Sequence, residues 1–376
     1  MNRRTVLKSA IATTAFGALG MRRPQKSAAA RRLRLIQQDL PMYEIVDLYA
    51  NTEEIAIGGQ SWIGAVRDVA NDGAMIGEVV ENGTFRPVTW DATGNMTYLP
   101  LGAYEGTWAL GWVINSSGLA GGELRPPETL SAEGAQVDWE TTPLVWKSGQ
   151  LDDSFGSMLP AGTDILRLSD AGLFTGAIND APARWTSSNV ETMEIPSGYT
   201  GGAARAQNTL GDAAFSVWQS GPPWIGSTPG IWSAAGTVNM LDLPGGRVPG
   251  WAGSIRPIAL SDDGQLVVHA LDGDSYFGAI YRYIDGVPMQ LADAYGEGAR
   301  LADANEYGDY VGVSAYSGIP IPTLWVDDQP TVLADRIVPG PDRLLTDVQG
   351  INDARAIVGS ANDSAGVSYS VLLRPV

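Results

Sequence analysis

The 376-residue chain carries 42 acidic and 24 basic residues, a formal charge of −18, with 46 glycines, 23 prolines and no cysteine. The glycine and proline content favours a turn-rich β protein over a helical bundle, and the lack of cysteine excludes disulfides, thiolate metal ligands and a cysteine nucleophile. A body this acidic repels phosphate backbones, so we expect no nucleic-acid partner.

The first 30 residues have the layout of an export signal. A basic start that includes Arg3, Arg4 and Lys8 precedes a mildly apolar run over 9–20, and small residues follow at 28–30. This order is typical of a cleaved signal peptide. The Arg-Arg-Thr-Val-Leu-Lys core resembles a twin-arginine (Tat) signal, which implies export of the folded protein from a prokaryotic cytoplasm, to the periplasm, the cell wall or the medium. We expect a linker at 31–41, and no later segment is apolar enough for a transmembrane helix.

Two kinds of β pattern follow along the chain. The alternating segment 43–49 predicts a strand that has no partner nearby in the sequence. Residues 65–100 then contain four short apolar runs separated by turns at 71–73, 81–85 and 91–94. Short runs between Asn, Asp and Gly turns predict a four-stranded antiparallel meander.

The four-stranded unit recurs. Its Pro-x-x-Trp at 87–90 returns at 143–146, 182–185, 229–232 and 322–325, and weaker versions end at Tyr283 and Leu372. A glycine follows most of the first turns by four residues, at Gly77, Gly122, Gly176, Gly312 and Gly359, while Phe215 and Val268 take that place in copies four and five. Seven copies spaced by roughly 40–55 residues match the period of propeller blades.

The pattern Asn-Asp-x-Gly-x-x-x-Gly … Trp-x-x-Gly-x-x-x-x-Leu resembles the HAF-type extracellular repeats over about residues 63–376. The resemblance implies a secreted β-propeller, and it brings no catalytic residues with it.

We therefore predict an all-β fold, a single β-propeller domain over 42–376 with seven four-stranded blades. The seventh copy ends after its third strand at 371–373, so the strand at 43–49 is expected to complete the last blade and to close the ring. Six or eight blades are the alternatives, because copies two and four carry insertions.

The order of antiparallel strands sorts the loops by side. Within each blade, the 1–2 and 3–4 turns lie on one side, the short-turn face; the 2–3 loops and the connections between blades lie on the other, the loop-rich face. Variable loops on a rigid scaffold usually carry binding sites. The candidate ligand-binding aromatics on the loop-rich face are Trp62, Tyr104, Trp108, Trp139, Tyr199, Trp224, Trp251 and Tyr295. The repeated Trp90, Trp146, Trp185, Trp232 and Trp325 are expected to pack between blades instead.

Arginines recur at or near the start of the innermost strands, which would line the central channel. They are Arg67, Arg167, Arg205, Arg256, Arg300 and Arg343. A cationic channel mouth suits a carboxylate or a sulfate. The alternative is that each arginine pairs with a neighbouring aspartate such as Asp68 or Asp303.

The sequence offers little for catalysis or for metals. Its one histidine, His269, is expected to be structural, and no metal site is expected. Asp272-Gly273-Asp274 resembles only the start of a calcium loop and favours a turn, so we expect no cofactor, with a structural calcium ion as the weaker alternative.

These observations lead to a functional hypothesis. We expect a secreted, monomeric, non-catalytic propeller that binds a ligand on its loop-rich face, in the cell envelope or outside the cell. Carbohydrate is the favoured class, because aromatic rings stack on sugar faces. The alternatives are a polysaccharide hydrolase or lyase with carboxylates and arginine at the channel mouth, and a structural or protein-interaction disc.

Overall fold

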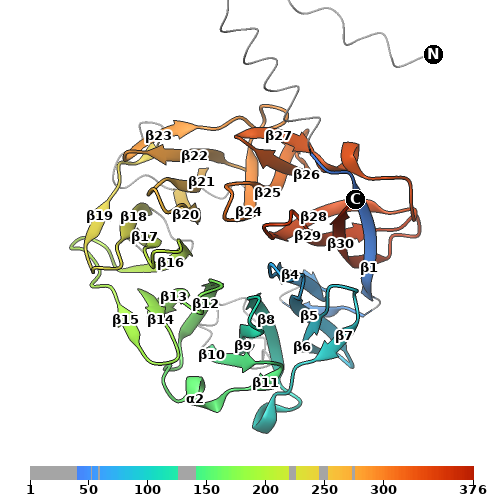
Figure 1. The fold of residues 1–376 in the computed structure, drawn as a ribbon, viewed down its shortest axis with the longest axis horizontal. Coiled ribbons are helices and arrows are strands. Elements are labelled where there is room, and N and C mark those ends of the chain that lie inside the picture. Colours follow the sequence, from blue (N-terminus) through green and yellow to red (C-terminus); the bar gives the residue numbers. More distant parts are fainter. Residues whose placement is uncertain are drawn as a thin grey trace, which may run out of the picture. The chain divides into compact units, whose positions relative to one another are not determined.

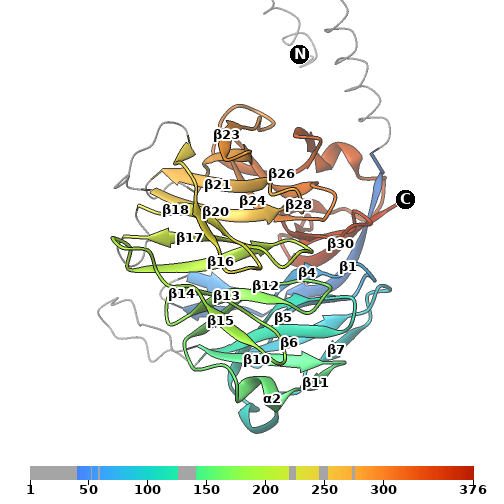
Figure 2. The same cartoon turned by 60° about the vertical axis from the view of Figure 1, so that its left-hand side comes forward.

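A computed structural model describes residues 40–51, 53–57, 60–125, 141–219, 226–244, 253–272 and 276–376. Across these residues, seven four-stranded antiparallel sheets follow one another around a ring (Figures 1 and 2). The predicted seven-bladed propeller is therefore confirmed. No helix in this part of the chain has the length and apolar character needed to cross a membrane.

Each blade contains four strands, ordered from the innermost to the outermost. Blade 1 is β4 (Ala65–Val69), β5 (Met75–Glu81), β6 (Thr84–Trp90) and β7 (Met96–Tyr98). Blade 2 is β8 (Trp108–Ile114), β9 (Leu119–Arg125), β10 (Thr142–Lys147) and β11 (Gln150–Leu151). Blade 3 is β12 (Thr163–Leu168), β13 (Phe174–Ile178), β14 (Ala181–Trp185) and β15 (Val190–Thr192). Blade 4 is β16 (Gly201–Gln207), β17 (Ala213–Trp218), β18 (Thr228–Trp232) and β19 (Val238–Met240).

The remaining blades continue this order. Blade 5 is β20 (Gly253–Leu260), β21 (Leu266–Asp272), β22 (Ala279–Ile284) and β23 (Val287–Gln290). Blade 6 is β24 (Ala299–Ala304), β25 (Tyr310–Tyr316), β26 (Ile319–Val326) and β27 (Gln329–Val332). Blade 7 is β28 (Leu344–Ile351), β29 (Ile357–Asn362), β30 (Ser368–Pro375) and β1 (Tyr43–Asn51). A hairpin of β2 (Ile55–Ile57) and β3 (Gln60–Trp62) follows β1, and the short helices are η1 (Gly102–Tyr104), α2 (Asp153–Gly156) and η3 (Leu333–Arg336).

Strand β1 closes the ring. It pairs antiparallel with β30, from Tyr43 opposite Pro375 to Asn51 opposite Ser368, with a register shift between Asp47 and Tyr49. Figure 1 shows this strand, in blue, against the red blade 7. The predicted closing strand is thus confirmed and runs two residues beyond 49. The outermost strand of the last blade comes from the other end of the chain, so the seam is held by a full strand pair.

The repeated tryptophans form the packing between blades. Trp90, Trp146, Trp185 and Trp325 are fully buried, and Trp232 is 5% exposed. The indole N–H of Trp146 donates to the carbonyl of Pro100 (2.8 Å), and that of Trp325 donates to the carbonyl of Ala292 (2.9 Å). These two indoles therefore tie their blades to the connection that leaves the preceding blade, as well as burying a large apolar area.

The repeated glycine marks a close approach of two backbones. In every blade the pairing of the first two strands shifts register near the end of the innermost strand. Beside this shift, a Cβ added at Gly176 would overlap the carbonyl oxygen of Asp164. The same overlap with an innermost-strand carbonyl would occur at Gly77, Gly122, Gly312 and Gly359. In blade 4, Phe215 takes this place, and the residue opposite it is Gly230, where a Cβ would overlap the Phe215 ring.

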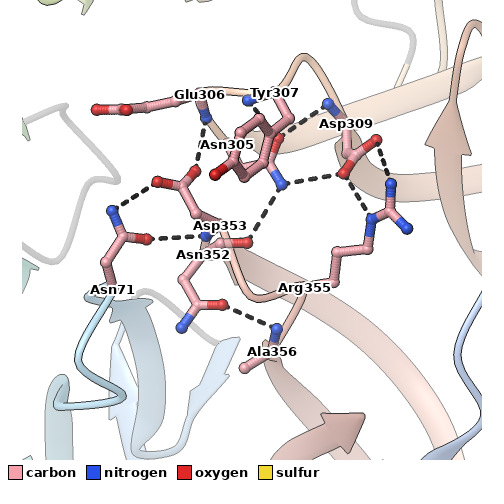
Figure 3. A network of polar contacts seen from close by, with 9 residues as sticks. All are labelled: Asn71, Asn305, Glu306, Tyr307, Asp309, Asn352, Asp353, Arg355 and Ala356. Atoms are coloured by element: carbon pink, nitrogen blue, oxygen red, sulfur yellow. Dashed lines mark hydrogen bonds and ion pairs between the residues drawn. The ribbon is translucent and has the colours of Figure 1, made fainter.

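Side-chain amides link neighbouring blades on the short-turn face. The first residue of the 1–2 turn donates its Nδ2–H to the corresponding carbonyl of the next blade in four cases. These pairs are Asn115 to Ser169 (2.9 Å), Asn208 to Ser261 (3.3 Å), Asn305 to Asn352 (3.2 Å) and Asn352 to Ala70 (2.9 Å). Figure 3 draws the bond from Asn305 to Asn352. These amide bonds join blades 2–3, 4–5, 6–7 and 7–1. One of them therefore links the last blade to the first.

Candidate functional site

A cavity of about 400 Å³ lies on the ring axis at the short-turn face. The ends of the innermost strands and the 1–2 turns line it, and six carboxyl groups are present: Asp68, Asp170, Asp262, Asp303, Glu306 and Asp353. Arg167 is the only basic residue among the described residues that line it. The cavity is therefore acidic.

Most of the carboxylates at its rim already accept hydrogen bonds from the neighbouring blade. Asp353 accepts from the backbone N–H of Glu306 (2.9 Å) and from Asn71 Nδ2 (2.8 Å), as Figure 3 shows. Asp170 accepts from the N–H of Ser116 (3.1 Å) and from the same Asn71 amide (2.9 Å). These carboxylates satisfy turn amides and hold the blades together, so their first role is structural.

The deeper pair of aspartates repeats this arrangement. Asp68 accepts from the N–H of Ile114 (3.0 Å), and Asp303 accepts from that of Ile351 (3.1 Å), in each case across a blade junction. Asp303 also pairs with Arg167 at 3.1 Å. Burial, followed by the charge of Asp303, raises the pKa of Asp68 to about 6.

Four of the predicted channel arginines have ion-pair partners. Arg167 pairs with Asp303 (3.1 Å) and Arg300 with Asp347 (2.8 Å), each of them on an innermost strand of another blade. Arg67 pairs with the buried Glu78, and its guanidinium lies 4.9 Å from the ring of Trp112. Pairing with a carboxylate, the alternative interpretation, therefore holds for these three.

Arg343 is the fourth, and its predicted place at the channel mouth is wrong. Its Nη2 lies 2.6 Å from a carboxylate oxygen of Asp47, on the outermost strand β1, and its guanidinium stacks 3.8 Å from the ring centroid of Tyr369. The loop before β28 carries it outward, so closeness in sequence to an innermost strand did not place it on the axis.

Arg205 and Arg256 lie in the same region as Arg167 and Arg300. Burial and the charge of Arg256 lower the pKa of Arg205 to about 9, so it stays charged at neutral pH. Arg256 is exposed to water and has no ion-pair partner among the described residues. Neighbouring protein groups nevertheless exclude part of the water around its guanidinium, and this desolvation lowers the pKa of Arg256. The positive charges of Arg300 and then of Arg167 lower that pKa further. Positive charge thus gathers inside blades 3–6.

The two ends of the channel differ in sign. Arg300 and Arg256 belong to the first halves of β24 and β20, near the connections that enter these blades, whereas the cavity is lined by the last residues of the innermost strands. The short-turn end is therefore acidic, whereas toward the loop-rich end of blades 5 and 6 Arg256 keeps a positive charge with no carboxylate partner in the described residues.

His269 lies beside this basic group. It is opposite Arg256 in the strand register, 1% exposed, and neither ring nitrogen has a hydrogen-bond partner in the described part of the chain. Burial, followed by the charge of Arg256, lowers its pKa to about 3. A neutral, buried imidazole fits the predicted structural role better than that of a general base.

The buried histidine predicts a specific dependence of stability on pH. The folded-state pKa is depressed, so between about pH 6.5 and pH 3 the unfolded chain binds a proton that the folded chain does not. Stability therefore decreases as the pH is lowered through that window. Lowering the pH from 6 to 4 reduces the free energy of unfolding. We expect this reduction to be about 2 kcal/mol smaller in His269→Leu than in the wild type. Urea unfolding at both pH values measures this; equal losses in the two proteins would contradict it.

The predicted aromatics of the loop-rich face divide into two groups. Trp108 packs edge-on against Phe85 (centroids 5.7 Å apart), and the half-buried Tyr199 donates its hydroxyl hydrogen to Thr228 Oγ1 (2.9 Å). Tyr104, in η1, and Tyr295 are 40% and 42% exposed. Three of the predicted aromatics lie outside the described residues: Trp139, Trp224 and Trp251. The side chain of Trp62 and most of the calcium-like turn at 272–274 lie outside them as well.

Tyr295 belongs to an exposed aromatic group that the sequence reasoning did not assemble. Its ring centroid lies 4.9 Å from that of Tyr316, which is 53% exposed. Tyr276, 55% exposed, stacks its ring 4.8 Å from the Arg300 guanidinium. We call Tyr276, Tyr295 and Tyr316 the tyrosine group. Tyr276 lies in the 2–3 loop of blade 5, and Tyr316 is the last residue of β25, next to the 2–3 loop of blade 6. Both could have been found by assigning the tyrosines, as well as the tryptophans, to a face.

The loop that carries Tyr295 is tightly held. Asp293 accepts hydrogen bonds from the backbone N–H of Tyr295 (2.9 Å), of Gly298 (3.1 Å) and of Gly296. The N–H of Ala294 donates to Ser314 Oγ (3.2 Å), which fixes the loop to blade 6. The ring of Tyr295 is thus presented by a backbone that is already in place, and a ligand would not have to order it.

Comparisons with known proteins support the fold alone. No protein-family model matches the sequence, and a search of curated proteins found no match. Among solved structures, acylaminoacyl peptidase from Pyrococcus horikoshii matches with a TM-score of 0.52 and 9% identity, over 83% of this chain and 51% of that one. The β-propeller domain of the Trilobed protease from Pyrococcus furiosus, described as an open velcro topology, matches with a TM-score of 0.46 and 10% identity, over 83% of this chain and 95% of that one.

A third structure, YCF48 bound to a D1 peptide, matches with a TM-score of 0.48 and 14% identity, over 90% of this chain and 98% of that one. The chain spans about half the length of the first peptidase and hydrolase structures that it matches. At these identities the likeness shows a β-propeller and carries no activity with it.

Proposed function

We propose that this chain is a non-catalytic binding propeller that holds a carbohydrate on its loop-rich face, against the tyrosine group of blades 5 and 6. The observation that carries the proposal is the exposed Tyr295–Tyr316 pair, presented on a loop fixed by Asp293. Aromatic rings that are rigid and open to solvent stack on the apolar faces of sugars at small cost in conformational entropy.

The hydrolase alternative requires two carboxyl groups placed for acid and base chemistry in one pocket. In the short-turn cavity, Asp170 and Asp353 accept hydrogen bonds from turn amides, and Asp303 is held by Arg167. Carboxylates held in this way favour a structural role, so hydrolysis in this cavity is the less favoured function.

The setting of this function follows from the N-terminal motif and from the repeats. We propose that the Arg3-Arg4 segment directs Tat export, that the repeats belong to the HAF type, and that the mature protein acts as a monomer in the cell envelope or outside the cell. Mass spectrometry of the exported protein would locate the N-terminus, and Arg3→Lys with Arg4→Lys should retain the protein in the cytoplasm.

The binding proposal is tested by a double variant, Tyr295→Ala with Tyr316→Ala. We expect it to lose at least about tenfold in affinity for the polysaccharide that the wild type binds, because each ring contributes on the order of 1 kcal/mol of stacking. Affinity electrophoresis against a panel of polysaccharides measures the loss.

The matched control is Tyr307→Ala. Tyr307 is 75% exposed and lies in the 1–2 turn of blade 6, on the short-turn face (Figure 3). It should bind like the wild type. Equal retention of the double variant and the wild type would contradict the proposed site.

A further inference from the structure

We propose that Arg256, with Arg300 beside it, is an anion subsite, so that the saccharide of the loop-rich face is an acidic one that carries a carboxylate or sulfate group. This inference rests on the proposed function, and it assigns to the ligand a charge that the tyrosine group alone does not require.

The channel arginines differ in whether a carboxylate balances their charge. Arg167 is paired with Asp303, and Arg300 with Asp347. Arg256 is exposed to water and has no carboxylate partner in the described residues. Its guanidinium therefore has its hydrogen-bond donors available to a ligand.

Arg256 lies among other arginines and beside a neutral histidine. Arg300 and Arg167 lie near enough to disfavour its charge, and His269, next to it in the strand register, stays neutral. The charge of Arg256 is therefore not compensated by a described carboxylate, although the chain as a whole carries −18. An anion placed against Arg256 would relieve this repulsion in a site that is partly shielded from water.

An aromatic ring lies on Arg300, whose charge lowers the pKa of Arg256. Tyr276 stacks on the Arg300 guanidinium and keeps more than half of its surface exposed. A ring next to guanidinium groups matches a sugar ring with an oxyanion substituent, because the ring packs on the tyrosine and the anion meets the arginine donors. Carboxylate and sulfate share this chemistry, so a uronic acid and a sulfated sugar are both possible sources.

The first experiment uses small anions. At least one of sodium sulfate and sodium galacturonate, at millimolar concentration and with ionic strength held constant with chloride, should raise the Tm of the full chain. Arg256→Gln should abolish that shift. Arg374→Gln is the control, because it removes an exposed arginine that pairs with Glu44 on the outermost strand. Equal shifts in wild type and Arg256→Gln, or no shift with either anion, would overturn the subsite.

The second experiment separates this inference from the proposed function. Binding to polygalacturonate, to heparin and to neutral dextran is measured for wild type, Arg256→Gln and Arg374→Gln. We expect at least tenfold weaker binding of one acidic polymer by Arg256→Gln alone, and little binding of dextran by any of them. If dextran binds as tightly as the acidic polymers and Arg256→Gln changes nothing, the inference fails and saccharide binding stands. If no polymer binds but the anion shift depends on Arg256, the proposed function fails and the anion subsite stands.

Discussion

Alanine in place of Gly176 is expected to destabilise the propeller by at least about 3 kcal/mol, at the upper end of the usual cost of overpacking. A Cβ there would overlap the carbonyl oxygen of Asp164 and would also lie 3.0 Å from the buried ring of Trp185. The obstacle is backbone on one side and a packed indole on the other, so neither a rotamer change nor a small side-chain shift relieves it. Urea unfolding followed by tryptophan fluorescence measures the loss.

A control separates this clash from the general cost of losing a glycine. Gly236 has a φ of +88° and no atom within 4 Å of an added Cβ. Gly236→Ala should therefore cost only about 1 kcal/mol, the strain of a side chain in the left-handed region. If the two substitutions cost the same, close backbone approach is not the reason for the repeated glycine.

Removal of the closing strand is expected to have the larger effect. A chain that starts after Asn51 loses all of β1, which leaves β30 as an open edge and takes away the fully buried Tyr43. Losing one large buried side chain alone costs about 3–5 kcal/mol, and a whole domain is stable by only about 5–15 kcal/mol. We therefore expect no cooperative thermal transition, together with aggregation through the exposed edge.

The matched control is a chain that starts at Pro41 and keeps β1. It should melt like the full chain in circular dichroism and should elute as a monomer in size-exclusion chromatography. If both shortened chains melt alike, strand β1 does not hold the ring closed.

The fold was largely predictable because each blade is a short sequence repeat whose strands and turns are neighbours along the chain. Two signals repeat in the sequence: the Pro-x-x-Trp strand and the turn before each second strand. A third signal is that the last copy has no fourth strand. The blade count and the closing strand at 43–49 follow from them and are confirmed. The glycine of each second strand was visible in the sequence, but its reason, the carbonyl of the neighbouring strand, appears only in three dimensions.

The site was less predictable because its contacts join distant parts of the chain. Arg343 meets Asp47 from the other end of the sequence, and Arg300 meets Asp347 in the next blade. The arginines sit at different offsets from their turns, so the sequence could not show which of them keeps a counter-ion and which, like Arg256, lacks one. Tyr316 was hidden for a similar reason, since only its contact with Tyr295 gives it meaning.

The opposite signs at the two ends of the channel give the disc an electrical polarity along its axis. Asp170, Asp262, Glu306 and Asp353 line one end, and Arg256, which has no carboxylate partner in the described residues, lies toward the other. Near a negatively charged polymer the acidic end is pushed away and the basic end is drawn in, which turns the molecule before any contact forms. An acidic polymer would therefore approach the channel more readily from the end where Arg256 lies than from the short-turn face.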